Sequence, residues 1–464
     1  MKKISVIYIV LSMIILSMSV FTCYAEPEAE NTEEAVVVYD DSPAPHAYSA
    51  ILVDMKSGKV LFSKKETEKL YPASTTKILT AILTLENANL DDVVVAQREA
   101  IEPITNKHSH MGILIGEELT VRQLLYGMLV YSANDAANVL AVHISGSIEA
   151  FAEMMNNKAA ELGAVNSHFV NPHGFHDDNH YTTAQDLSII SLYAMKNETF
   201  REIVKTDMYT IDPTNKYKEI RYLSNTNHLV SNRRRYEYVY KKATGIKTGF
   251  TDEAGSCLVS SAVDGDTELL AVVMKCKNTT MVNNGSYSFV DSKNLLEYGF
   301  DNFKYITIIP NGDIVSDSGV YEAKNDVRVA LTPEVDISAL LPIDVKMEEI
   351  EKNTVLNEKI AAPIEKGDIL GTVTCVYKGE IIGTSNLVAT NSVQKDYIAA
   401  TIHLIVKIIT HPIVLILIIV IAFVMIRARI IRERKKRMRR SRLQHVDNGY
   451  EHRAPRDKYQ RRRR

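Results

Sequence analysis

A serine and a lysine stand three residues apart in the stretch YPASTTKILT, residues 71–80. The apolar residues that follow repeat at the spacing of a buried helical face: Ile78, Leu79, Ile82, Leu83 and Leu85. Positions three apart share one helix face, so the Ser74 hydroxyl and the Lys77 amine are expected to lie side by side. A serine becomes a useful nucleophile when a neighbouring base takes its proton, which makes this pair a candidate nucleophile and base.

The spacing alone is weak, because it recurs at Ser392 and Lys395 in SVQK. A capping serine followed by a solvated lysine is the simpler interpretation of either pair. Companion residues elsewhere in the chain must therefore decide which pair could be catalytic.

A second candidate group lies where a helical pattern breaks. The stretch QLLYGMLVY, residues 123–131, runs into Ser132-Ala133-Asn134, after which DAANVLAVHI resumes helical spacing. A serine and an asparagine at such a break can both reach into one cleft. Local capping of the helix ends is the alternative.

The third group is Lys247-Thr248-Gly249, on a predicted strand in TGIKTGF. Lys247 and Gly249 would share one face of the strand and Thr248 would point to the other. A glycine there allows a substrate backbone to lie close to the strand. An edge-strand lysine beside a bulge glycine is the structural alternative.

The elements around these groups predict an α+β protein. Residues 49–55 and 60–63 form a predicted hairpin, and helical patterns dominate 121–194. The stretches ATGIKTGF, SCLVSSAV and TELLAVVMKCK predict an antiparallel meander, which the helix SKNLLEYGF follows near residue 300. Short β-type runs from about residue 305 to 390 predict a small β-sandwich.

Both ends of the chain predict contact with a membrane. Residues 1–25 have the basic start, apolar run and small final residue of a secretory signal peptide, with an uncleaved anchor as the alternative. Residues 408–426 are almost wholly apolar, nearly the ~20 residues that span a bilayer. Basic flanks stay in the cytoplasm, so the catalytic part is expected outside and the C-terminus inside.

The net charge of −3 hides an uneven distribution. Residues 427–464 hold 17 Lys and Arg against 4 Asp and Glu, a net +13, which leaves −16 on residues 1–426. Such a tail is expected to be attracted to anionic membrane lipid, and it does not require nucleic-acid binding.

The cysteines and histidines indicate neither a disulfide framework nor a metal site. Only Cys257, Cys276 and Cys375 would remain after removal of a signal peptide. His173, His176 and His180 match no zinc-ligand spacing, and they precede a helix start at Thr183-Ala-Gln-Asp186 that resembles a capping box.

The three weak groups gain weight from their order along the chain. The S-x-N group follows Ser74 by 58 residues and the K-T-G lysine follows it by 173. This ordered trio is known in penicillin-binding proteins and class A β-lactamases. The stretches PASTTK, YSANDAANVLA, NPHGF, YTTAQDL, GIKTGFTDEAG and LLEYGF add to the resemblance. Residues 46–390 thus resemble the low-molecular-mass penicillin-binding proteins that are serine-type D-alanyl-D-alanine carboxypeptidases.

The resemblance implies a penicillin-binding-protein/β-lactamase-like domain of antiparallel sheet and helical subdomain, then a small β-sandwich domain and a C-terminal transmembrane helix. The expected boundaries, in chain order, are signal peptide 1–25, acidic spacer 26–45, catalytic domain 46–303, β-rich domain 304–395, membrane-proximal and transmembrane segment 398–426, and basic cytoplasmic tail 427–464.

The resemblance also implies roles for the residues. Ser74 would attack the carbonyl of the terminal D-Ala–D-Ala bond of a peptidoglycan stem peptide while Lys77 accepts its proton. Ser132 would relay a proton to the leaving D-alanine. The remaining residues would bind substrate: Asn134 a substrate amide, Lys247 and Thr248 the terminal carboxylate, Gly249 the substrate backbone, and the N–H groups of Ser74 and Phe250 the oxyanion. β-Lactam antibiotics would acylate Ser74, and no metal or organic cofactor is expected.

Two departures from the family and two alternative functions remain. Phe250 stands where many relatives have histidine, and NNGSYSFVDSKN, residues 283–294, lacks an arginine that relatives often carry there. Carboxylate binding would then depend more on Lys247 and Thr248, or on another residue. A β-lactamase is one alternative, although no E-x-x-L-N pattern lies between Ser132 and Lys247. A catalytically idle, membrane-bound wall-binding or scaffold protein is the other.

Overall fold

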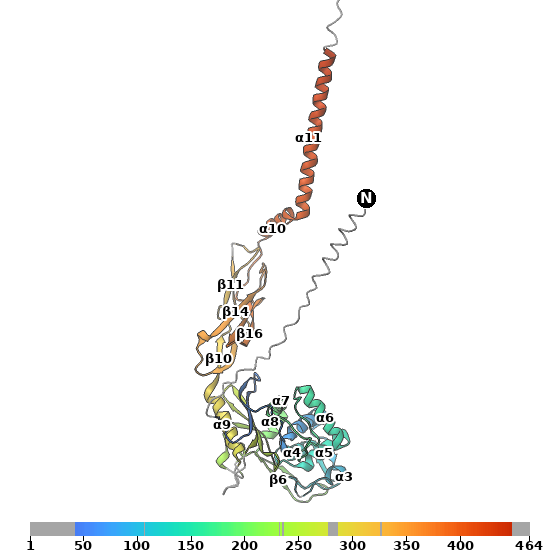
Figure 1. Cartoon of the computed structure of the whole chain (residues 1–464), viewed down its shortest axis with the longest axis vertical. Coiled ribbons are helices and arrows are strands. Elements are labelled where there is room, and N and C mark those ends of the chain that lie inside the picture. The colour runs from blue at the N-terminus through green and yellow to red at the C-terminus, as the bar shows by residue number, and fades with distance from the viewer. Residues whose placement is uncertain are drawn as a thin grey trace, which may run out of the picture. The chain divides into compact units, whose positions relative to one another are not determined.

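The computed structural model describes residues 42–447 except 106, 232, 234–235, 277–285 and 325–326 (Figure 1). The predicted signal peptide, most of the acidic spacer and the tail beyond residue 447 lie outside these residues. The chain divides into two compact units, Met1–Tyr305 with Leu340–Asp344, and Ile306–Ala339 with Val345–Arg464.

The first unit is built on a five-stranded antiparallel sheet in the order β2-β1-β9-β8-β7. The strands are β1 Ser49–Asp54, β2 Val60–Lys64, β7 Ala243–Thr251, β8 Gly255–Asp264 and β9 Thr267–Cys276. The predicted N-terminal hairpin and the later meander are both confirmed. They join through β1 and β9, where Leu52 faces Ala271, so the two ends of this unit form one sheet.

Alternate residues of the sheet enter two hydrophobic cores, as expected for a sheet that is buried on both faces. Ile51 and Val53 pack among the helices of the middle segment, whereas Leu52 packs with Leu295 and Leu296 of α9 Tyr287–Asn302. Figure 1 shows α9 on one side of the sheet and helices α4 to α8 on the opposite side.

The middle segment is helical, as predicted. Its elements are η1 Ala73–Thr76, α2 Lys77–Asn87, α3 Arg98–Ile101, α4 Val121–Leu129, α5 Asn134–Ser145, α6 Ile148–Leu162, α7 Ala184–Ala194, α8 Glu198–Lys205 and η2 Tyr236–Tyr238. Two short antiparallel ribbons accompany them, β3 Val93–Val95 with β4 Glu118–Thr120, and β5 Met208–Ile211 with β6 Arg221–Ser224. Thr183 accepts from the Asp186 N–H and starts α7, which confirms the predicted helix start.

The second unit is β-rich. Its main sheet has the order β11-β12-β16-β15-β14, formed by β11 Ser316–Gly319, β12 Arg328–Pro333, β14 Ile350–Leu356, β15 Ile369–Tyr377 and β16 Glu380–Ala389. Strands β10 Phe303–Ile309 and β13 Ile337–Pro342, which have residues in both units, pair with each other, and η3 spans Met347–Glu349 in the second unit. Buried Val329, Leu331, Val373 and Leu387 supply core residues of this unit.

Two helices follow the β-rich region, α10 Tyr397–Thr410 and α11 Pro412–Asp447. Pro412 is the first residue of α11, a position where its fixed φ and missing N–H carry no cost. By length and composition, Pro412–Arg440 is able to cross a membrane.

Candidate active site

Ser74 lies in the short helical turn η1, directly before α2. The Thr75 hydroxyl donates to the Pro72 carbonyl and fixes this turn, while Ile78 and Leu79 anchor α2 in the core. Lys77 is the first residue of α2 and is fully buried. Its Nζ lies 2.8 Å from Ser74 Oγ, so the structure brings the predicted pair into direct contact.

The Lys77 amine has two further partners. Its Nζ lies 2.7 Å from Asn134 Oδ1 and 2.8 Å from the carbonyl oxygen of His173. A neutral amine has two N–H groups and one lone pair. It can donate to these two oxygens and still accept the proton of the Ser74 hydroxyl. The geometry therefore suits a lysine that acts as a base.

Electrostatics favour the neutral form of Lys77. Burial lowers the pKa of Lys77 well below its ordinary value, and the nearby Lys247 lowers it further, while Asp135 partly opposes them. Burial also lowers the pKa of Lys247, to about 7.

Ser132 and Asn134 lie at the predicted break between α4 and α5. Ser132 is 7% exposed and has φ +69, a left-handed conformation that is uncommon for a serine and turns the chain sharply before α5. Asn134 begins α5 and donates its N–H to the Ser109 carbonyl, at 2.8 Å. The turn thus places the Asn134 amide against Lys77.

Lys247, Thr248 and Gly249 lie on β7, an edge strand of the sheet. Lys247 and Gly249 are buried whereas Thr248 is half-buried, in agreement with the predicted alternation. A Cβ on Gly249 would come within 2.8 Å of the Pro72 carbonyl oxygen and 3.1 Å of the Ser74 nitrogen. The glycine is thus required because β7 runs directly against the backbone that carries Ser74, and not because of a bulge.

Phe250 follows Gly249 and is 54% exposed. Its backbone continues the strand that passes Ser74, and its side chain points toward solvent. The predicted oxyanion donors, the N–H groups of Ser74 and Phe250, therefore belong to two adjoining stretches of backbone.

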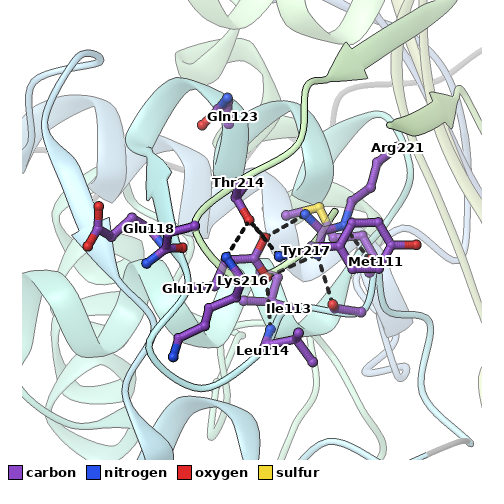
Figure 2. Close-up of polar contacts among 12 residues, drawn as sticks. Met111, Ile113, Leu114, Glu117, Glu118, Gln123, Thr214, Lys216, Tyr217 and Arg221 are labelled. Carbon is purple, nitrogen blue, oxygen red and sulfur yellow. Dashed lines mark hydrogen bonds and ion pairs between the residues drawn. The ribbon is translucent and has the colours of Figure 1, made fainter. Parts of the chain in front are cut away.

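Several residues that the sequence did not single out hold this arrangement together. Asp135 accepts the N–H groups of Met111 and Ile113, and so ties α5 to the loop before β4. That loop is held in turn by a buried ion pair, Glu117 with Arg221, whose atoms approach to 2.7 Å and 3.0 Å (Figure 2). In the sequence, the only feature that could have pointed to one of these residues is that Asp135 directly follows Asn134.

The histidines near the site have structural partners. His180 Nε2 lies 2.8 Å from Thr76 Oγ1, and His173 Nδ1 accepts the Phe175 N–H. Among the described residues, no group of three or more His, Cys, Asp or Glu side chains could hold a metal ion. Cys257, Cys276 and Cys375 are free, buried thiols.

The segment that lacks the family arginine is only partly described, because residues 283–285 lie outside the described ranges. In the described part, the Ser286 side chain caps α9 and Asp291 accepts the N–H groups of His46 and Ala47.

The competing Ser392–Lys395 pair has a different environment. The Lys395 ammonium pairs with Glu322 at 2.9 Å, and Ser392 Oγ accepts the Lys366 N–H at 3.0 Å. Both side chains serve local structure in the β-rich unit, although the serine caps no helix and the lysine is ion-paired rather than solvated.

Comparison with known proteins agrees with this geometry. A family model described as D-alanyl-D-alanine carboxypeptidase matches residues 36–278, and a model of the penicillin-binding protein 5 C-terminal domain matches residues 303–395. The chain is 31% identical over 379 residues to D-alanyl-D-alanine carboxypeptidase DacF of Bacillus subtilis, covering 81% of this chain and 90% of that protein.

Solved structures give the same result. Penicillin-binding protein 5 from Haemophilus influenzae matches with a TM-score of 0.57 and 29% identity, over 77% of this chain and all of that one. The Streptomyces K15 DD-transpeptidase matches with a TM-score of 0.51 and 32% identity, over 56% of this chain and 99% of that one. With its serine–lysine pair and the C-terminal β-rich unit that the second model matches, the chain belongs to the D-alanyl-D-alanine carboxypeptidase family of serine peptidases, the low-molecular-mass penicillin-binding proteins.

Proposed function

We propose that Ser74 is the nucleophile that removes the terminal D-alanine from peptidoglycan stem peptides. The observation that carries this assignment is the contact of Lys77 Nζ with Ser74 Oγ at 2.8 Å, made by a lysine whose other two partners are carbonyl oxygens. Family membership supplies the substrate class, peptides that end in D-Ala–D-Ala.

Family membership and the Ser74–Lys77 contact support the following reaction. Lys77 accepts the Ser74 proton as Ser74 Oγ attacks the carbonyl carbon of the terminal peptide bond. The N–H groups of Ser74 and Phe250 stabilise the resulting oxyanion. Ser132 donates its proton to the nitrogen of the leaving D-alanine and takes up the proton that Lys77 had accepted, which leaves Lys77 neutral. Water then attacks the acyl-enzyme, and Lys77 is again available as the base.

The rest of the site binds the substrate. Asn134 uses its amide to hold Lys77 and a substrate amide. Lys247 and Thr248 bind the terminal carboxylate, and Gly249 lets β7 lie close to the backbone that carries Ser74. A β-lactam ring reacts with Ser74 in the same way and forms a slowly released acyl-enzyme.

The described residues also support a membrane-anchored enzyme. We place the catalytic unit outside the membrane, α11 across it and the basic residues from Arg427 onward in the cytoplasm next to anionic lipid. The support is the apolar length of Pro412–Arg440 together with the net charge of +13 on residues 427–464.

Labelling with a fluorescent penicillin tests the assignment of the nucleophile. Wild-type protein is expected to form a stable adduct, and Ser74→Ala is expected to lose both the adduct and the release of D-alanine, while it keeps its fold because only a hydroxyl is removed. Ser392→Ala is the matched control from the second serine–lysine pair and is expected to label fully.

The three candidate functions give different results in this experiment. A stable adduct supports a penicillin-binding protein, rapid turnover of the penicillin would indicate a β-lactamase, and no adduct would indicate an idle scaffold. Covalent labelling of Ser74→Ala would show that another residue is the nucleophile.

A further inference from the structure

A second threonine contacts Thr248 from outside the three motifs. Thr226 Oγ1 lies 2.7 Å from Thr248 Oγ1, and both side chains are half-buried. The Thr226 N–H donates to the Val130 carbonyl, two residues before Ser132. Thr226 therefore touches the strand with Lys247 through its side chain and the segment with Ser132 through its backbone.

The turn that carries Thr226 is held by two buried asparagines. Asn225 donates to the carbonyls of Val204 and Thr206, and its Oδ1 accepts the N–H of Asn227. Asn227 Oδ1 accepts the Leu229 N–H, and both asparagines are at most 2% exposed. Buried amides that are bonded to backbone groups fix a turn more firmly than surface contacts would.

The strand leading into this turn is anchored at its other end. β6 begins at Arg221, whose guanidinium is 5% exposed and bonds both carboxylate oxygens of Glu117. Figure 2 shows Arg221 also reaching the loop carbonyls, with Nε 3.0 Å from the Met111 oxygen. Thr226 thus lies in the turn just after a short strand, β6, that is fixed at its start by Arg221 and followed by the bonded asparagines.

We propose that Thr226 is a positioning residue that orients the Thr248 hydroxyl toward the carboxylate of the substrate; this rests on the proposed role of Thr248. A threonine hydroxyl has one proton to donate and two lone pairs to accept. The substrate carboxylate only accepts, so Thr248 must donate its proton to it. Thr226 then donates to the Thr248 oxygen, which fixes the rotation of that hydroxyl and strengthens its donation.

Substitution of Thr226 tests this role. Thr226→Val has the same shape without the hydroxyl, and Thr226→Ser retains the hydroxyl. For D-alanine release from a peptide ending in D-Ala–D-Ala, Thr226→Val is expected to raise KM about five- to tenfold with little change in kcat. A change of this size corresponds to the net free energy of one hydrogen bond. Only KM changes because the bond is made equally in the bound state and in the transition state. Thr226→Ser is expected to restore most of the loss.

The same strand supplies a matched control. Thr244 on β7, three residues before Lys247 and outside the three motifs, also makes a 2.7 Å contact, with Ser261. Thr244→Val removes one hydrogen bond between two hydroxyl groups in the same sheet. It is expected to leave KM and kcat unchanged. All variants are made in the full-length, detergent-solubilised protein, and equal thermal unfolding shows that they are folded.

A double variant tests whether both threonines act through one hydroxyl. Thr226→Val combined with Thr248→Val is expected to lose no more than Thr248→Val alone. The inference is wrong if Thr226→Val behaves like Thr244→Val, or if Thr226→Ser is as impaired as Thr226→Val. It is also wrong if the double variant shows the product of the increases in KM of the two single variants. Failure of the proposed function looks different, since wild-type protein would then release no D-alanine and take no penicillin label.

Discussion

The candidate site contains two buried lysines with lowered pKa values, and the roles proposed for them require opposite protonation states. Lys77 must be neutral to accept the Ser74 proton, and burial together with Lys247 lowers its pKa. Lys247 must be charged to attract a carboxylate, and burial lowers its pKa to about 7. Activity should therefore be limited at both ends of the pH range.

We predict a bell-shaped dependence of kcat/KM on pH. The rising limb follows the loss of the proton from Lys77, and the falling limb, near pH 7, follows the loss of the charge on Lys247 in the free enzyme. A bound carboxylate raises the pKa of Lys247, so the falling limb of kcat should lie at higher pH than that of kcat/KM.

Steady-state release of D-alanine between about pH 5 and 10 measures both limbs. Lys247→Arg keeps its charge throughout this range, so the falling limb should disappear in that variant. A wild-type kcat/KM that continues to rise up to the ordinary pKa of lysine would contradict the lowered values.

The residues of the three motifs could be predicted from the sequence. The groups that hold these residues in place could not. Ser74 and Lys77 could be paired because a helix turn fixes their spacing, and the order of the three motifs separated them from Ser392 and Lys395. The His173 carbonyl that accepts from Lys77 could not be predicted, because every residue has a carbonyl and only the tertiary fold selects this one. Thr226 meets Thr248 for the same reason.

At the scale of elements, the loop before β4 depends on one buried ion pair. Glu117 is fully buried, and its carboxylate accepts from Arg221, from the Leu114 N–H and from the Thr214 hydroxyl (Figure 2). Burial by itself would raise the pKa of Glu117, but these hydrogen bonds outweigh it and lower the pKa below its ordinary value. The charged form is therefore the one that stabilises the fold.

We predict that Glu117→Gln lowers the free energy of unfolding by about 3–5 kcal/mol, because it leaves the Arg221 guanidinium buried without its counter-charge. Urea unfolding of the detergent-solubilised protein, followed by near-UV circular dichroism, measures the loss. Glu102→Gln is the control, since the Arg98–Glu102 pair is mostly exposed and should contribute less than about 1 kcal/mol.

The pH dependence of this difference provides a second check. A carboxylate with a lowered pKa stabilises the folded state above its unfolded pKa, and that contribution is lost as the pH falls through the folded value. The difference in free energy of unfolding between wild type and Glu117→Gln should therefore reach its full size at pH 7. It should become smaller only below pH 4.5, the ordinary pKa of glutamate. A difference that is absent at pH 7 would show that the pair does not stabilise the loop.

Secondary structure near the motifs was predictable because local patterns determine it. Alternating apolar residues predicted β1, β2 and the meander, and the helical repeat predicted α2, α4 and α5. The pairing of β1 with β9 joins segments more than 200 residues apart, and no local pattern indicates it. The buried Glu117–Arg221 pair was missed because either residue alone is typical of a solvent-exposed surface.

At the scale of the whole molecule, charge and hydropathy divide the chain into an acidic part, which ends with an apolar segment, and a basic tail. Residues 1–426 carry a net charge of −16 and residues 427–464 carry +13, with the apolar part of α11 ending at the change of sign. A helix that lies on a membrane surface needs a polar face, and Pro412–Ile426 has no charged residue on any side. This pattern favours a helix that crosses the membrane over one that rests on it.

We therefore predict a single membrane crossing, with the catalytic unit outside and the tail from Arg427 inside. External protease applied to intact, wall-stripped cells should remove the catalytic unit and leave a protected fragment that contains the tail, detected through a tag at the C-terminus. Adding detergent before the protease should remove that protection. Substituting two leucines in Pro412–Ile426 by arginine should weaken anchoring, because each charge at the centre of a bilayer costs about 2.5–3.5 kcal/mol on insertion scales. Release of the wild-type protein by alkaline carbonate would instead show a peripheral protein, because carbonate does not extract a helix that spans the bilayer.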